Sequence, residues 1–143
     1  MIQSLLKEVK FQKMIDTQAA GTGTTSSDIL DLAGANAAIG IVTLGDVADT
    51  SVITLKAYVG DESDLSDGAY LTTTATVTAD ATSADDKMLI LDCKELTGRY
   101  IRFDVVVATA NAVIETGVSG VYNYKALPVT QSADVVDSDL ALV

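Results

Sequence analysis

The sequence has no histidine and no tryptophan, and only one cysteine and one proline among its 143 residues. Histidine is the commonest general base and metal ligand, so the chain has no Ser-His or Cys-His pair to activate a nucleophile. A lone Cys93 can form neither a disulfide within the chain nor a thiol cluster around a metal. Solubility explains the carboxylates more simply than acid–base catalysis does. We therefore expect a protein that is not an enzyme and needs no cofactor.

Basic residues are also few, nine against 20 acidic ones, for a net charge of −11. Polyphosphate repels such a chain, so we expect no nucleic-acid partner. The strongest apolar run, residues 101–110, is interrupted by Arg102 and Asp104 and is shorter than the roughly 18 to 20 residues of a membrane helix. Residues 1–13 lack the apolar stretch of a signal peptide. We expect a soluble cytosolic protein without a membrane partner.

What the sequence has in abundance is the pattern of β-strands. The run from Gly98 to Val107 combines a turn residue with alternating side chains, which is typical of a strand. Similar runs bounded by turn residues predict strands at 28–32, 37–44, 51–59, 69–78, 87–93, 99–109 and 113–124. With a further strand in the first segment, these make eight short strands and no long helix. The predicted fold class is all-β, a jelly-roll-like antiparallel β-sandwich.

Alternation within the strands assigns their two faces. The residues predicted to point into the core are Ile39, Ile41, Ile53, Leu55, Ala57, Val59, Leu71, Ala75, Val77, Ile101, Phe103, Val105 and Val107. The outward residues of the run at 99–109 are Tyr100, Arg102 and Asp104, which we expect to be available for ion pairs or a neighbour. A row of Tyr70 and threonines at 72–78 predicts a polar outer face.

The chain divides into three regions. Residues 1–15 are expected to form an N-terminal arm leading into the first strand, although 2–16 carries both helical and strand patterns. Residues 16–130 make the sandwich, and 131–143 form an acidic tail that is either disordered or ordered by a neighbour. Small polar residues at 19–27 predict a loop, and residues 110–112 predict a turn.

Three further patterns contain residue types that are found in binding sites. The acidic segment 61–68 offers calcium-type oxygen ligands, but its spacing departs from a calcium loop, and a solvated hairpin loop is the simpler interpretation. Gly21-Thr22-Gly23 is not followed by the lysine of a phosphate loop. The aromatic residues are too dispersed for an obvious sugar-stacking platform, although the tyrosines could anchor an interface or pack at the core edge.

Several segments together resemble a known family. They are Leu30-Asp31-Leu32, residues 38–42, 60–64 and 87–92, Gly98-Arg99-Tyr100-Ile101-Arg102, and residues 122–130. Across roughly residues 7 to 130 the chain resembles the jelly-roll decoration, or cement, proteins of tailed-bacteriophage heads. Its most specific element is the Arg-Tyr-x-Arg strand, followed by a tyrosine-rich strand that ends in Pro-Val-Thr.

The resemblance implies a virion protein on the outer capsid surface, commonly a homotrimer, that clamps neighbouring major capsid subunits without a cofactor. We expect the N-terminal arm to supply capsid or subunit contacts. The residues expected to do so are Leu5, Leu6, Lys7, Val9, Lys10, Phe11 and Lys13. Two alternatives stay open at this point: a host-adhesion or carbohydrate-binding module of a head or tail fibre, and a neck or tail structural subunit.

Overall fold

The computed structural model describes residues 4–81 and 83–135. It is an all-β, jelly-roll-like antiparallel sandwich, as the sequence predicts, with one short helix before the first strand. In chain order the elements are α1 (Leu5–Glu8), β1 (Lys10–Ile15), β2 (Gln18–Ser26), β3 (Leu30–Asp31), β4 (Ala37–Val47), β5 (Val52–Gly60), β6 (Ala69–Tyr70), β7 (Ala75–Thr78), β8 (Met88–Cys93) and β9 (Tyr100–Tyr122).

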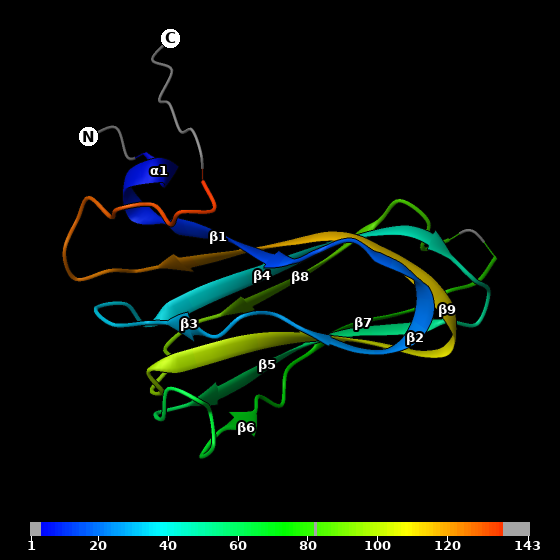
Figure 1. Cartoon of the computed structure of the whole chain (residues 1–143), viewed down its shortest axis with the longest axis horizontal. Coiled ribbons are helices and arrows are strands. Elements are labelled where there is room, and N and C mark those ends of the chain that lie inside the picture. Colours follow the sequence, from blue (N-terminus) through cyan, green and yellow to red (C-terminus); the bar gives the residue numbers. More distant parts are fainter. Residues whose placement is uncertain (1–3, 82, 136–143) are drawn as a thin grey trace, which may run out of the picture.

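The long strand β9 connects the two layers of the sandwich (Figure 1). Its residues 100–108 pair with β5 on one side and with β3 and the end of β2 on the other. Its residues 112–122 pair with β4 on one side and with β1 and the start of β2 on the other. β6 and β7 extend the first group beyond β5, and β8 extends the second beyond β4. We call the first group the β5 layer and the second the β4 layer.

Two strands pass from one layer to the other at the same end of the molecule (Figure 1). β9 bends at Thr109, a non-glycine residue with a φ of 72°. β2 bends beside it, where its pairing with β9 shifts between Gly21 and Gly23, whose φ is 131°. The predicted turn at 110–112 and loop at 19–27 are therefore wrong. The small residues mark a bend, but main-chain pairing between the two strands continues on both sides of it.

The core lies between the two layers. From β9, Ile101, Phe103, Val105 and Val107 point into it, which confirms the face predicted for that strand. Ile53, Leu55 and Ala57 of β5 lie beside them in the same layer and are fully buried. Across the core, Ala38, Val42 and Leu44 of β4 complete the packing.

The prediction that Ile39 and Ile41 belong to the core is wrong. Both residues are only half-buried and lie on the outer face of β4, one position out of step with the buried set. The reason lies at Gly40, because a Cβ built there would be 2.8 Å from Cδ1 of Phe103. The residue that faces the Phe103 ring must be small, so glycine points inward and the two isoleucines point outward.

The predicted strand at 69–78 is interrupted. Tyr70 pairs with Tyr58, and Ala75 pairs with Leu55. Tyr70 and Ala75 are five residues apart, whereas their partners on β5 are only three residues apart. The two extra residues leave the ladder between β6 and β7. The polar face predicted for this segment is confirmed, because Tyr70 and the threonines at alternate positions are exposed.

A C-terminal segment, residues 129–134, runs along the outer edge of β1, and we call it the strap. The Val129 N–H donates to the Lys7 carbonyl at 2.9 Å, and Ser132 Oγ donates to the Phe11 carbonyl at 2.8 Å. The Gln131 side chain donates to the Leu6 and Val9 carbonyls. Side chains of the strap thus bind an edge that would otherwise be open. The remainder of the predicted tail, 136–143, lies outside the described residues.

Replacing Gln131 with alanine is expected to lower the free energy of unfolding by about 2 kcal/mol, because it leaves backbone groups of the arm without partners. The Gln131 side-chain amide binds both donors and acceptors of this backbone. Its nitrogen donates to the Leu6 and Val9 carbonyls, and its oxygen accepts from the Phe11 N–H at 2.9 Å. Chemical denaturation of the full chain measures the effect. Thr130→Ala is the matched control and should change stability little, and equal losses in the two variants would contradict this role of Gln131.

Candidate functional site

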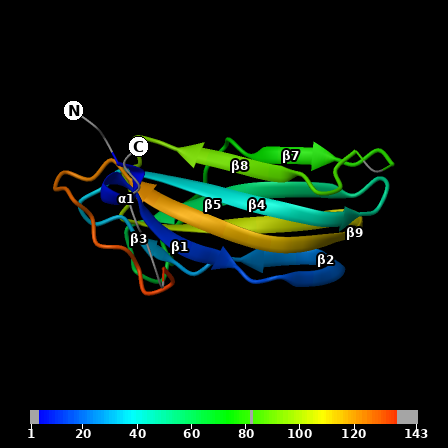
Figure 2. The same ribbon diagram turned by 90° about the horizontal axis from the view of Figure 1, so that it is seen from above.

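The outer face of the β4 layer carries a group of apolar side chains from three neighbouring strands. Strand pairing sets Ile41 of β4 between Ile90 of β8 and Val118 of β9. Met88 lies two residues before Ile90 on β8, on the same side of the strand. Met88, Ile90 and Val118 are 57%, 49% and 39% exposed, which is unusual for large apolar side chains held on regular strands. Figure 2 looks onto this layer, with β8, β4, β9 and β1 side by side.

A hollow of about 620 Å³ continues this face at the end nearest α1. The residues that line it include the apolar Leu5, Ala37 and Leu127, together with Tyr122 and the charged Glu8, Lys94 and Glu95. Leu5 is 63% exposed and Leu127 is 54% exposed. Exposed leucines beside a hollow can be buried by a partner, and contiguous apolar surface of this kind marks interaction sites.

Two of the polar residues that line the hollow, Tyr122 and Lys94, bind the same carboxylate. The Tyr122 hydroxyl donates to Asp92, and Lys94 forms an ion pair with the same carboxylate, at an N–O distance of 3.5 Å. Burial, followed by the contact with Asp92, raises the pKa of the Tyr122 phenol well above its usual range. Burial also raises the pKa of the neighbouring Cys93 thiol to about 11, so it stays protonated and unreactive at neutral pH.

The structure brings part of the predicted arm to this surface. Val9 and Phe11 lie over Gly120 of β9, next to Ile39. Leu5 lines the hollow. Lys13 is exposed at the edge of the face and pairs with Asp16. These residues do not form a free arm, since residues 10–15 are paired with β9 as strand β1.

The other predicted contact residues lie elsewhere. Lys10 lies on the opposite side of β1, in a small hollow with Asp31 and Tyr124. Leu6 is half-buried and Lys7 is exposed, and the backbone of both accepts bonds from the strap. Sequence reasoning missed Met88, Ile90 and Val118 altogether. The signal that could have found them is that both alternating sets of β4, Ala38-Gly40-Val42 and Ile39-Ile41, are apolar or small, which is typical of a strand covered on both faces.

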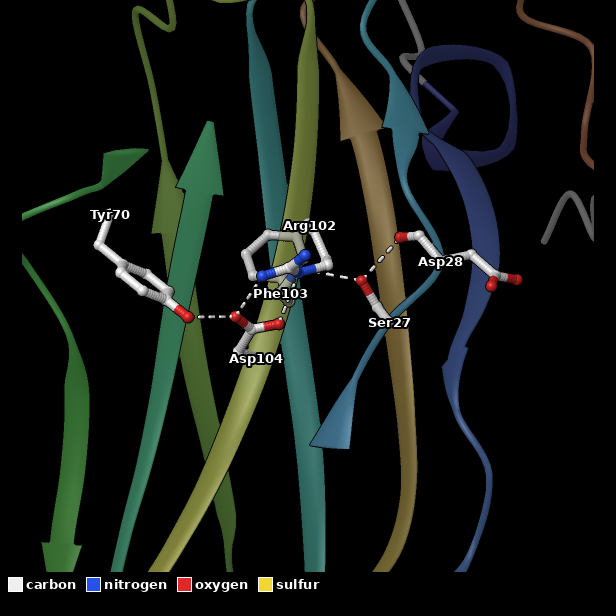
Figure 3. A network of polar contacts seen from close by, with 6 residues as sticks. All are labelled: Ser27, Asp28, Tyr70, Arg102, Phe103 and Asp104. Carbon is white, nitrogen blue, oxygen red and sulfur yellow. Dashed lines mark hydrogen bonds and ion pairs between the residues drawn. The ribbon is translucent and has the colours of Figure 1, made fainter. Parts of the chain in front are cut away.

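The outer face of the β5 layer differs sharply, because it is polar and charged. Asp104, predicted to be available on this face, is instead 0% exposed. The Arg102 guanidinium donates two bonds to its carboxylate, at 2.8 and 2.9 Å, and the Tyr70 hydroxyl donates a third at 2.6 Å (Figure 3). The carboxylate is buried because these two side chains close over it.

Tyrosines on this face offer no flat platform for a sugar. The rings of Tyr58 and Tyr70 meet edge to face, with centroids 4.8 Å apart and planes at 68°. Arg102 lies over the Tyr58 ring and Lys56 over the Tyr70 ring, at 5.0 and 4.7 Å from the centroids. Their faces are therefore already occupied by cations.

Two carboxylates of the acidic segment 61–68 accept hydrogen bonds from the backbone of the same segment. Asp67 accepts from the backbone N–H groups of Asp61 and Glu62, and Asp64 accepts from that of Ser66. These bonds lower the pKa values of Asp64 and Asp67. Over residues 4–81 and 83–135, no group of three acidic, cysteine or histidine side chains could hold a metal ion.

No protein-family model matches the chain, and no curated protein matches it. Among the residues described, no helix is long and apolar enough to cross a membrane. What the arrangement offers chemically is a surface for binding: an apolar face with a hollow at one end, on a sandwich whose opposite face is covered by charged and hydroxyl groups.

Proposed function

We propose that this chain is a structural virion protein that binds the outside of a tailed-phage capsid and stabilises it by clamping neighbouring major capsid subunits. The observation that carries the proposal is the apolar outer face of the β4 layer, where Met88, Ile90 and Val118 are exposed on regular strands. The resemblance to cement proteins indicates that the partner is a capsid subunit. The apolar side chains form the surface that such a subunit can cover.

The contrast between the two outer faces supports an oriented attachment. Apolar surface gains free energy when it leaves water, at about 25 cal/mol per Å², whereas charged groups lose hydration. The β4 layer therefore faces the capsid in this proposal, and the charged face around Asp104 and Lys56 faces the solvent. Four strands about 4.8 Å apart give a face roughly 15 Å wide. A specific contact takes about 800 Å² per partner, which is a large area for so narrow a face. We therefore place the hollow and its leucines in the same contact as the apolar side chains.

Val118→Lys is expected to weaken binding to phage heads at least tenfold, because it places a charge at the centre of the contact. The measurement is binding of the purified protein to heads that lack it, by co-sedimentation. Thr76→Lys is the matched control, since Thr76 is exposed on the opposite outer face. Wild-type affinity for Val118→Lys, with unchanged thermal unfolding, would remove the apolar face from the proposal.

The arm is tested with a point variant, because deleting residues 1–13 would also remove most of strand β1. Leu5→Lys should weaken head binding without unfolding the sandwich, since Leu5 is 63% exposed. Electron microscopy of labelled particles then locates the protein. Density on the outer capsid agrees with the proposal, whereas density confined to a tail ring or a fibre tip contradicts it.

A further inference from the structure

Strand β8 forms an edge of the β4 layer whose backbone groups point away from the sheet. In antiparallel pairs, alternate residues direct both N–H and C=O toward the same neighbouring strand. The Leu44 N–H donates to the Lys87 carbonyl at 2.8 Å, which fixes this alternation. Leu89, Leu91 and Cys93 accordingly bond to β4. The backbone groups of Met88, Ile90 and Asp92 face outward.

Those outward groups are open within the described chain. β8 pairs there with β4 alone, and no described residue bonds to the backbone of Met88, Ile90 or Asp92. The other edge of the same layer, at β1, is closed by the strap through Gln131 and Ser132. One layer thus has one edge capped by its own chain and one edge left free.

The composition of β8 makes this free edge able to pair. Its sequence, Met-Leu-Ile-Leu-Asp-Cys, has no proline or lysine, the residues that commonly protect an edge. Met88 and Ile90 are exposed beside the open backbone groups. An apolar edge with unpaired backbone groups is a template for another strand.

We propose that the edge is filled by β8 of a second copy of this chain, running antiparallel, with Ile90 of each copy on a two-fold axis. In this register Ile90 opposes Ile90 and Met88 opposes Asp92, so all the residues with outward backbone groups pair with one another. A shift by one pair toward the N-terminus would oppose Asp92 to Asp86, and centring on Asp92 would oppose two carboxylates. Centring on Leu91 would pair only Ile90 and Asp92 of the outward residues within the strand. The register centred on Ile90 pairs all three of them and opposes no like charges within the strand.

Charge and area set the strength of this pairing. In the centred register Lys94, just past the strand, lies next to Asp86 of the second copy, which favours the dimer. Each chain carries a net charge of −11, which opposes it and is screened by salt. A contact along one short strand is smaller than the about 800 Å² per partner of a standard interface. We therefore expect a reversible dimer that strengthens with protein and salt concentration.

The inference goes beyond the proposed function, because it concerns the free protein and specifies a two-fold pair in place of the homotrimer expected from the resemblance. The dimer joins two β4 layers edge to edge. Val118 and the hollow stay uncovered, so the surface assigned to the capsid remains available in each copy.

Sedimentation equilibrium of the full chain, from micromolar to millimolar protein and at low and high salt, tests the pairing. The wild type should approach twice the monomer mass. Ile90→Lys should weaken association at least tenfold, because it puts two lysines together on the axis. Val118→Lys is the control, since it changes the same face away from the edge and should dimerise like the wild type.

A crosslink tests the register directly. Opposed residues of a hydrogen-bonded antiparallel pair have Cα atoms about 5.5 Å apart, which suits a disulfide. With Cys93→Ala as background, Ile90→Cys should give an oxidised dimer, and Val118→Cys should not. A monomer under all conditions, a trimer mass, or an Ile90→Lys protein that associates like the wild type would each overturn the proposal. Head binding by Val118→Lys is a separate readout, so either proposal can fail alone.

Discussion

Replacing Phe103 with alanine is expected to lower the free energy of unfolding by about 4 kcal/mol. The side chain is 0% exposed and projects from β9 into the space between the layers. Its backbone is fixed on one side by Ser27, with the N–H donating to Ser27 Oγ at 2.9 Å, and on the other by pairing with Ala57 of β5. Because neither neighbour can move far, the cavity that the removed ring leaves cannot collapse, and the loss of stability is large. Equilibrium unfolding in urea measures the loss.

A double-mutant cycle tests the contact that makes this position costly. Gly40→Ala alone should cost about 1 to 3 kcal/mol, since the new Cβ would lie 2.8 Å from Cδ1 of Phe103. With Phe103→Ala the obstruction is gone, so the double variant should be more stable than the sum of the two losses predicts. Val106→Ala, on the outer face of the same strand, is the control and should cost far less. Additive losses would mean that Gly40 and Phe103 do not contact each other as described.

The strand at Tyr100–Val107 shows how much of the fold the sequence could predict. Polar and apolar residues alternate there, so the two faces have different chemistry and the inward set is unambiguous. In β4 the same method fails, because Ile39 and Ile41 are as apolar as Val42 and Leu44. Only the distant Phe103 ring decides which set points inward, and a pattern within one strand contains no information about a residue some 60 positions away.

Strand β2 could not be predicted for a related reason. Its threonines and glycines bury little surface, and most of its residues are exposed. It is a strand because its backbone pairs with β9, a partner more than 75 residues away. Local composition therefore indicated a loop, whereas long-range main-chain hydrogen bonds determine the structure.

The candidate site was predictable only in part. The apolar residues of the arm, Leu5 and Phe11, indicated one end of it. The remaining part depends on which strands are neighbours, since Ile41, Ile90 and Val118 come from three separate segments. The strap was missed because its side-chain-to-backbone bonds leave no periodic pattern in the sequence.

Replacing Asp104 with asparagine should lower the free energy of unfolding by about 3 kcal/mol at neutral pH. Asparagine keeps the shape but removes the charge that Arg102 pairs with and one of the acceptor oxygens. Arg102 has only 28% of its side chain exposed, so water replaces the lost partner poorly. Tyr70→Phe is the matched control, because it removes one bond to the same carboxylate and leaves the ion pair, and it should cost about 1 kcal/mol.

The pH dependence distinguishes a lost charge from a merely altered fit. Burial raises the pKa of Asp104, but the bonds that it accepts from Arg102, Tyr70 and Ser26 outweigh burial and hold the pKa below its usual value. A carboxyl group whose pKa is lower in the folded state stabilises the fold above its unfolded pKa of about 3.9 and loses that contribution as the pH falls through the folded value. The stability difference between wild type and Asp104→Asn should therefore be constant near neutral pH and shrink below about pH 4. Asp31, Asp64 and Asp67, whose pKa values are also lowered, titrate in both proteins and cancel from this difference. A difference that stays constant through the acid range would show that shape alone, without the charge, accounts for the role of Asp104.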